Sequence, residues 1–502
     1  MSEQKYSIAR KAAKNESYYF NNPNSKKRIL FTFSIESEIN LNKQIDILDK
    51  AIYEWKLMHP FLRCYVMNKN VDSLVETYFV YVDDEKIKNS FLNVNLLNLD
   101  LSEKDETNGI FEETWKLLAE KELMTPLEFF SGNFLWRLTL FTVNESHSKD
   151  KYKYCILFTI NHGICDGRTS YNCIIHLFQI IESIYKNEYT RQEPFKMYPG
   201  SEFYTDFIDE FQSDILSVPE IEIPNFYNQN IEEKCEFETN LEFFKNRYLL
   251  NEKININNGP EFVTIESLLE NSKTNFSKFI LSSFDESKTR HLLRLSKHYD
   301  VKLNSCLKSI LSIAMIMLHS KFDTKLSTVA IVTPVDSRSY FMGKYGPENF
   351  QSIGVHADGF LSRFENQFDD LKFGDEKWIE KFWQLSKNDT DLIKQMIENK
   401  EFLKKTNFKK GVELKKMAVH FNFTNYGVLQ NHTKKQVIQI KGFSSMVAFV
   451  NKAQLNFPLI ILSNTINNQI YFTFRYNSAL INKDIIDSLI EYTHQISDAL
   501  LS

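Results

Sequence analysis

Two blocks of the chain alternate between strand-like and helix-like patterns of hydrophobic and polar positions. In the first block, clusters of aromatic and β-branched residues predict strands, and apolar residues recurring every three to four positions predict helices. The predicted strands span residues 29–35, 77–82, 135–141 and 154–160. The predicted helices span residues 41–58 and 168–185.

The second block begins near Phe279 and repeats this alternation. Its predicted helices span residues 289–298, 305–319, 375–400 and 484–500, and its predicted strands span residues 328–335, 416–423, 437–440, 459–463 and 469–476. Residues 187–273, between the blocks, lack a regular pattern and hold several prolines, which favours a crossover segment lying over the surface. Strands and helices in both blocks predict an α/β protein of two sandwich-like units packed together.

The units follow the chain order in this interpretation. The N-terminal unit covers residues 1–186, the crossover covers 187–275, and the C-terminal unit covers 276–502.

The composition narrows the class of protein. Of the 502 residues, 43% are hydrophobic and 25% are charged, which is typical of a soluble globular protein. The net charge of -5 predicts no strong field that would attract nucleic acid or an anionic membrane. The longest apolar stretch, residues 310–318, is shorter than the about 20 residues that span a bilayer. We therefore expect neither a nucleic-acid partner nor a membrane span.

The cysteines and the N-terminus indicate a compartment. The six cysteines are scattered, and no C-x-x-C pair or Cys/His spacing typical of a metal site occurs. The first residues contain no apolar stretch of the kind that a secretory signal needs. We expect reduced thiols, no bound metal and a cytoplasmic protein.

The candidate chemistry lies directly after the predicted strand 154–160. The segment Asn161-His162-Gly163-Ile164-Cys165-Asp166-Gly167 joins this strand to the next predicted helix. A strand end can hold a histidine rigidly toward a cleft, and an unperturbed pKa of about 6.5 suits the imidazole to proton transfer at neutral pH. Gly167 permits backbone conformations that other residues resist. The alternative interpretation is a structural histidine followed by an ordinary turn.

The segment resembles the H-x-x-x-D-G signature of the acyltransferase superfamily with the chloramphenicol acetyltransferase-like fold. That superfamily includes alcohol acetyltransferases and the condensation domains of peptide synthetases. Further segments resemble the family's landmarks in the family's order, at residues 59–63, 126–127 with 135–138, 335–338 and 422–427. The resemblance implies two chloramphenicol acetyltransferase-like α/β sandwich subdomains with an active-site tunnel between them.

The resemblance also implies roles for individual residues. His162 would act as the general base that deprotonates the acceptor, without a covalent acyl-enzyme. Asp166 would pair with Arg338, and this pair together with Gly167 would support the turn that carries the histidine. Thr424 and Asn425 are candidates for contacts with the substrate or with the oxyanion of the tetrahedral intermediate.

The implied co-substrate is an acyl-CoA or an acyl-phosphopantetheine, with no permanently bound cofactor. The other partner would be a small-molecule hydroxyl or amine acceptor, and we expect a monomer. Many condensation domains have a second histidine where this chain has Asn161, which favours acyl-CoA over a donor bound to a carrier protein.

Three alternatives stay open at this point. The first is a stand-alone condensation-type enzyme that uses a carrier protein, and the second is a non-catalytic member of the fold that binds a ligand. The third is a Cys165/His162 nucleophile pair, although Ile164 and Asp166 supply no positive charge to activate the thiol.

Overall fold

The computed structural model describes most of the 502-residue chain. The described residues are 7–21, 28–71, 74–100, 107–127, 130, 132–144, 151–198, 200, 253–256, 263–264, 277–322, 325–336, 338, 342, 346, 351, 353–355, 357–398, 420–429, 437–447, 459–478 and 481–502. Most of the predicted crossover, and the first part of the strand predicted at 416–423, lie outside them.

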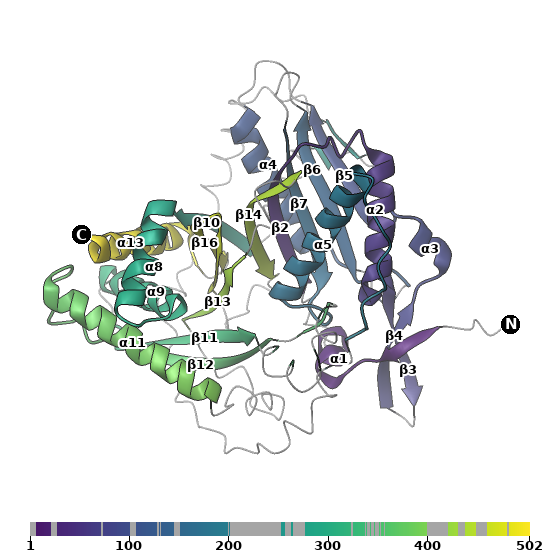
Figure 1. Ribbon diagram of the computed structural model, residues 1–502. Coiled ribbons are helices and arrows are strands. Elements are labelled where there is room, and N and C mark those ends of the chain that lie inside the picture. Colours follow the sequence, from purple (N-terminus) through teal and green to yellow (C-terminus); the bar gives the residue numbers. More distant parts are fainter. Residues whose placement is uncertain are drawn as a thin grey trace.

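A seven-stranded sheet forms the centre of the first subdomain (Figure 1). Its strands, in spatial order, are β14 (Ile438–Val447), β2 (Arg28–Ser37), β7 (Tyr152–Asn161), β6 (Trp136–Asn144), β5 (Val94–Asp100), β8 (Lys253–Ile256) and β9 (Val263–Thr264). β7 is buried from Tyr154 to Asn161, which explains its nearly continuous apolar sequence. This buried strand leads directly to His162.

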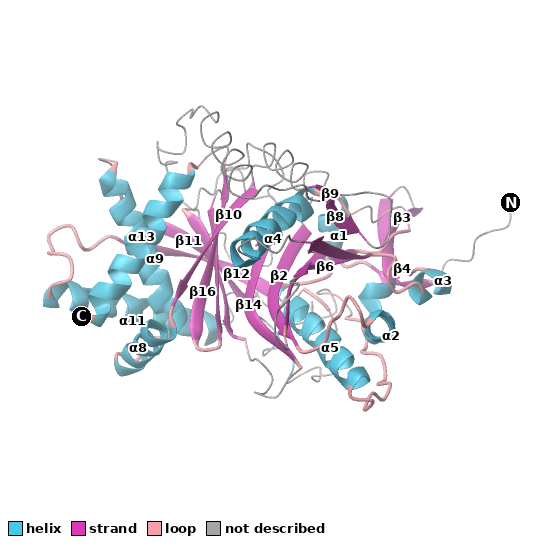
Figure 2. Ribbon diagram, turned by 90° about the horizontal axis from the view of Figure 1, so that it is seen from above, coloured by secondary structure: helices cyan, strands magenta, loops and turns pink. Residues whose placement is uncertain are grey.

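Helices cover both faces of this sheet (Figure 2). α2 (Ile45–Met58) and α5 (Gly167–Tyr185) pack on one face, where the indole N–H of Trp55 donates to the carbonyl oxygen of Cys173 at 2.7 Å. α4 (Thr107–Met124), which the hydrophobic pattern did not reveal, covers the other face. The sheet is therefore buried on both sides.

A six-stranded sheet forms the second subdomain. Its strands, in spatial order, are β10 (Ser277–Phe284), β16 (Gln469–Asn477), β15 (Leu459–Ile466), β13 (Phe421–Val428), β11 (Thr328–Asp336) and β12 (Ala357–Glu365). The helices packed with it are α8 (Glu286–His298), α9 (Leu303–Lys321), α11 (Glu376–Glu398) and α13 (Lys483–Leu501). Among the described residues, α9 is long and apolar enough to cross a membrane, but 78% of its apolar window is buried in the protein, as expected for a core helix.

A small third sheet lies beside the first subdomain. Its strands, in spatial order, are β1 (Ile8–Lys11), β4 (Leu74–Tyr81) and β3 (Cys64–Val71). Two short helices, α1 (Lys14–Asn21) and α3 (Asp84–Lys88), flank it, and the 3-10 turn Pro60–Arg63 precedes β3. α1 packs through Phe20 on Phe79 of β4.

The predicted α/β class with two sandwich-like subdomains is confirmed. Three of the described strands depart from the predicted division of the chain. β8 and β9 lie within the predicted crossover but extend the first sheet beyond β5. β14 comes from the second half of the sequence but pairs with β2 of the first sheet along its whole length, from Ile438 opposite Ser37 to Val447 opposite Ile29. The reason is physical, because β2 would otherwise be an exposed sheet edge. The boundaries at 186 and 275 therefore remain a division of the sequence rather than of the sheets.

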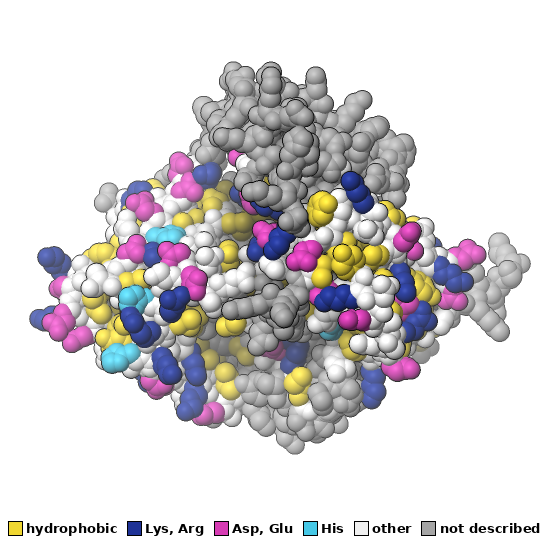
Figure 3. Space-filling model, turned by 45° about the horizontal axis from the view of Figure 1, so that its top comes forward, with side chains coloured by type: hydrophobic (Ala, Val, Ile, Leu, Met, Phe, Trp, Pro, Cys, Tyr) yellow, Lys and Arg dark blue, Asp and Glu magenta, His cyan; other side chains and the backbone are white. Residues whose placement is uncertain are grey.

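Acidic and basic side chains are interspersed on the surface seen in Figure 3. One hollow on the described surface, of about 690 Å³, is lined by residues between 366 and 384, beside and including the start of α11, and His162 is not among its lining residues. The tunnel between the subdomains remains a prediction.

Candidate active site

The candidate site is built on a strand, a turn and a helix. β7 ends at Asn161, His162 lies in the following turn, and α5 begins at Gly167. Asp166 is the N-cap of α5: its carboxylate accepts from the Thr169 N–H at 2.9 Å, and its own N–H donates to the Thr169 hydroxyl at 3.2 Å. This reciprocal capping box fixes the start of the helix and so the end of the turn.

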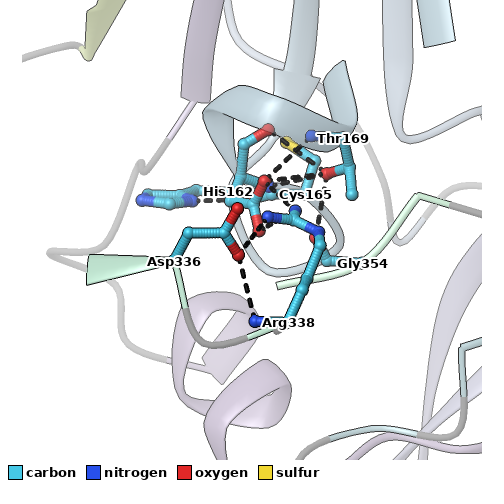
Figure 4. A network of polar contacts seen from close by, with 7 residues as sticks. His162, Cys165, Thr169, Asp336, Arg338 and Gly354 are labelled. Carbon is cyan, nitrogen blue, oxygen red and sulfur yellow. Dashed lines mark hydrogen bonds and ion pairs between the residues drawn. The ribbon is translucent and has the colours of Figure 1, made fainter. Parts of the chain in front are cut away.

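His162 is held by its own turn. Its Nδ1 atom lies 2.8 Å from the carbonyl oxygen of Cys165. A carbonyl oxygen can only accept, so Nδ1 carries the hydrogen and donates it, and Nε2 of the neutral ring keeps its lone pair. Figure 4 shows the imidazole pointing away from Arg338. The ring is partly buried, and its centroid lies 5.0 Å from that of Tyr19.

The structure brings Asp166 and Arg338 together. Nη2 of Arg338 donates to both carboxylate oxygens of Asp166 at 2.6 Å, and Nη1 pairs with Asp336 at 2.6 Å. Burial alone would lower the pKa of Arg338, but the two carboxylates outweigh it and raise the pKa. Asp166 belongs to the first subdomain and Arg338 to the second half of the chain, so a residue of the other half clamps the turn.

A second contact reinforces this clamp. The Thr169 hydroxyl donates to the carbonyl oxygen of Gly354 at 2.9 Å. Asp166 and Thr169, the two residues of the capping box, thus both bind the second half of the chain.

Gly167 has a different role from the one expected from its flexibility. It is the first residue of α5 and is absent from the glycines with positive φ among the described residues. A Cβ atom at this position would lie 1.8 Å from Cε1 of Tyr426. Only glycine fits because the tyrosine ring of β13 occupies the place of a side chain, and the expectation of an unusual backbone conformation was wrong.

Thr424 and Asn425 lie on β13 in the residues just before this tyrosine. The Thr424 hydroxyl donates to the Asn422 side chain at 3.2 Å, and the Asn425 carboxamide oxygen accepts from the Gly427 N–H at 2.8 Å. Because the carboxamide oxygen faces the Gly427 N–H, the NH₂ group of Asn425 points away from Gly427. Asn425 and Thr424 thus lie one and two residues before Tyr426, the residue of β13 that contacts the start of α5.

Cys165 does not suit a nucleophile. It is fully buried, and burial raises the pKa of its thiol well above the ordinary range, against the lowering effect of a hydrogen bond with Ser170, while the charge of Asp166 adds a smaller increase. The thiol lies 3.5 Å from the carbonyl oxygen of Asn161, to which it donates. A protonated, inaccessible thiol cannot attack a thioester.

The sequence assigned no role to two residues at the site, although one of them, Tyr426, lies in the landmark segment 422–427. Tyr19 of α1 lies against the His162 ring, and its Cβ atom would be 3.0 Å from a Cβ placed on Gly163. Tyr426 fills the space over Gly167, and its hydroxyl lies 2.7 Å from Ser445 of β14. The hints in the sequence were the glycines at 163 and 167, which leave room for a neighbour, and the landmark segment 422–427.

Within the described part of the chain, no group of three or more His, Cys, Asp or Glu side chains is arranged to hold a metal ion.

Comparison with known proteins gives the fold a wider context. No protein-family model and no curated protein matches the chain. Solved structures do match over nearly its full length. Trichothecene 15-O-acetyltransferase from Fusarium sporotrichioides has 14% identity and a TM-score of 0.63, with 98% of this chain and 95% of that chain covered.

Two further structures extend the comparison. Polyketide synthase associated protein 5 from Mycobacterium tuberculosis has 10% identity and a TM-score of 0.59, with 98% and 99% of the two chains covered. The first condensation domain of the calcium-dependent antibiotic synthetase, in complex with a substrate analogue, has 11% identity and a TM-score of 0.62, with 98% and 97% covered. The chain therefore has the two-subdomain chloramphenicol acetyltransferase-like fold, with its H-x-x-x-D-G segment clamped between the two halves.

Proposed function

We propose that this protein transfers an acyl group from a thioester donor to a hydroxyl or amine acceptor, with His162 as the general base. The observation that carries the proposal is the hydrogen bond from His162 Nδ1 to the Cys165 carbonyl oxygen. It leaves the Nε2 lone pair as the proton acceptor, in a turn that Arg338 clamps from the second half of the chain.

The proposed reaction proceeds by direct transfer. Nε2 of His162 takes the proton of the acceptor as its oxygen or nitrogen attacks the thioester carbonyl. The tetrahedral intermediate then collapses, and the proton held by His162 passes to the departing thiolate. Both substrates must be bound together, so positioning contributes much of the rate. The buried, protonated Cys165 supports a mechanism without a covalent acyl-enzyme.

The oxyanion of the intermediate needs a hydrogen-bond donor. We assign this role to the NH₂ group of Asn425, because its oxygen is engaged by Gly427 and its strand packs on the start of α5 through Tyr426. One such donor is typically worth about 3 to 4 kcal/mol of transition-state stabilisation. Thr424, whose hydroxyl donates to Asn422, serves as a supporting contact.

Coenzyme A is the donor that we propose. Asn161, in place of a second histidine, supports this choice over a carrier protein, and the likeness to an acetyltransferase structure is consistent with it. The second candidate is a stand-alone enzyme whose acyl donor is attached to a carrier protein. It is favoured by the likeness to a condensation domain, which covers as much of the chain as the likeness to the acetyltransferase.

A thiol-release assay tests the proposal. Acetyl-, butyryl- and decanoyl-CoA are incubated with the protein and a mixed set of alcohols and amines, and acceptor-dependent release of free CoA is followed. Wild-type protein should turn over, and His162→Ala should lose about 10² to 10⁴ in rate. His298→Ala, at an exposed position of α8, is the matched control and should retain wild-type activity.

Each other outcome has a defined meaning. If His162→Ala keeps most of the activity, the proposed base is wrong. Turnover only with acyl groups loaded on carrier proteins supports the second candidate. A protein that binds thioesters but transfers no acyl group from either donor is a non-catalytic member of the fold, which refutes the proposed function.

A further inference from the structure

A buried arginine lies next to the candidate base. Arg28 opens β2 and is the antiparallel partner of Asn161, the residue directly before His162. Only 5% of its surface is exposed, and within the described part of the chain its Nε and Nη1 atoms have no hydrogen-bond partner. Buried donors in folded proteins are nearly always satisfied. Two unsatisfied donors on one buried cation therefore indicate a missing acceptor.

The neighbouring carboxylate does not supply that acceptor. Glu122 of α4 binds Arg137, which approaches it through Nε at 2.7 Å and through Nη2 at 2.6 Å. The hydroxyls of Thr159 and Thr139 also donate to Glu122, at 3.2 and 3.3 Å. Both oxygens of Glu122 are thus engaged by residues other than Arg28.

The cluster keeps an excess positive charge. Paired residues of neighbouring strands, and residues two apart on one strand, share a sheet face. Arg28 opposite Asn161, and Arg137 opposite Thr159, therefore lie on the same face as Glu122. Burial and then the charge of Arg137 lower the pKa of Arg28 to about 10, against the opposing effect of Glu122, so Arg28 stays charged at neutral pH. Two guanidinium groups face one carboxylate.

This face borders the second subdomain. α4, which carries Glu122, contacts β10 through the ion pair of Glu120 with Lys278 at 2.8 Å. Trp115 stacks on Phe279 of the same strand, with ring centroids 6.1 Å apart. The cluster therefore lies between the contact of the two halves and the strand end that carries His162.

We propose that Arg28 binds a carboxylate carried by one of the two substrates, close to the atoms on which His162 acts. The inference rests on the proposed function and adds a substrate class to it. A carboxylate has the planar shape that a guanidinium fork binds through two parallel hydrogen bonds. Its single charge also balances the excess charge of the cluster.

A phosphate of coenzyme A fits this position less well. The pantetheine arm separates the nearest phosphate from the thioester by many bonds, whereas Arg28 is directly across the strand pair from the residue before His162. The carboxylate therefore belongs to the acyl group or to the acceptor.

Matched pairs of probes separate these sources. Succinyl-pantetheine and butyryl-pantetheine have acyl chains of equal length and differ by one carboxylate. 3-Hydroxybutyrate and butane-1,3-diol form the corresponding pair of acceptors. Butyryl-CoA compared with butyryl-pantetheine reports the contribution of the nucleotide phosphates.

Binding of each probe is measured by calorimetry to the wild type, to Arg28→Met and to Arg290→Met, an exposed arginine of α8 that controls for loss of charge. The wild type and Arg290→Met should bind the carboxylate member of at least one pair with at least tenfold higher affinity than the other member. In Arg28→Met the ratio of the two affinities should fall to near one. A wild type without such a preference, or an equal preference in Arg28→Met, overturns the proposal. So does a loss confined to the CoA comparison, which would assign Arg28 to a phosphate.

Thermal unfolding without ligand adds a second readout. An arginine kept for a ligand is not needed for folding, so Arg28→Met should melt at or above the wild-type temperature. A lower melting temperature assigns Arg28 a structural role and overturns the inference. Because both measurements use binding and stability rather than turnover, they stand apart from the His162→Ala test. A carboxylate preference without acyl transfer would refute only the proposed function, and acyl transfer without the preference would refute only this inference.

Discussion

Nη2 of Arg338 lies 2.6 Å from both carboxylate oxygens of Asp166, although 172 positions separate the two residues in the sequence. Both side chains are buried, so removing the carboxylate of Asp166 leaves the guanidinium of Arg338 with the half-exposed Asp336 in place of a buried partner. We expect Asp166→Asn to lower the free energy of unfolding by about 3 to 5 kcal/mol. Urea denaturation at neutral pH measures this change, together with the yield of soluble protein.

A double variant separates the ion pair from other effects of the substitution. Asp166→Asn combined with Arg338→Met removes both charges, and it should cost clearly less than the sum of the two single variants. Additive costs, or an Asp166→Asn protein with normal stability and normal turnover, would show that the pair does not support the turn.

Gly167→Ala tests the close approach of Tyr426. The added methyl group would lie 1.8 Å from the tyrosine ring, so the ring or α5 must move. Overpacking of this kind typically costs about 1 to 3 kcal/mol, and acyl transfer should fall because the turn of His162 shifts with the helix. Gly442→Ala is the matched control, since its nearest contact is an ordinary 3.7 Å.

A compensating change distinguishes the clash from a loss of backbone freedom. Gly167→Ala with Tyr426→Ala should recover part of the stability lost by Gly167→Ala alone, as followed by thermal unfolding. An unchanged melting temperature in the double variant relative to Gly167→Ala would point to the backbone instead.

Cys165 should stay unmodified during turnover. Its thiol is buried and its pKa is raised, so little thiolate forms near neutral pH. Intact mass after incubation with acetyl-CoA should equal that of the free protein, and iodoacetamide should label Cys165 only after denaturation. An acetyl adduct that maps to Cys165 would restore the nucleophile mechanism.

Two buried histidines of the second subdomain predict sensitivity to acid. Burial lowers the pKa values of His319 and His420 to about 4, and His319 contributes further to the shift of His420. Between about pH 6.5 and 4 the unfolded chain then binds more protons than the folded protein, so stability falls as the pH falls. Each histidine should contribute about 1.4 kcal/mol per pH unit within this window. Urea denaturation at pH 7.5, 6 and 5 measures the slope of the free energy of unfolding against pH.

His420→Asn provides the test of this assignment. The Ala330 N–H donates to Nδ1 of His420 at 3.0 Å, and the asparagine oxygen can accept the same hydrogen bond without titrating. The slope should decrease by the share of one histidine. His298→Asn, on the exposed side of α8, should keep the wild-type slope, and an equal slope in His420→Asn would exclude this residue as the source.

Local patterns predicted the long elements well because their physical causes are local. Helix α5 was expected at residues 168–185 and spans Gly167–Tyr185, since its apolar residues repeat with the helical period. Helix α4 was missed because both a sheet and the second subdomain pack on it, through Phe141 and Phe279, so its apolar positions do not fall on one face.

Sequence patterns could not predict the contacts between residues far apart in the chain. The segment around His162 was found because strand, motif and helix are contiguous. Arg338 was named as the partner of Asp166 only through a family resemblance, and the structure brings the two together. No periodicity could show that Tyr426 closes over Gly167 or that Arg28 lies across from Asn161, because these contacts depend on how distant strands are paired.

The path of β14 limits how the molecule can be divided. A polypeptide ending near residue 275 would lack this strand, and β2 would become an exposed edge strand that can pair with other chains and cause aggregation. The remaining half would carry an orphaned apolar ribbon with Phe443 and Met446 uncovered. Two separate genes divided near residue 275 should therefore yield insoluble products. Co-expression should restore solubility only if β14 of one product pairs with β2 of the other. Because one strand is exchanged between them, we expect the two halves to fold and unfold together.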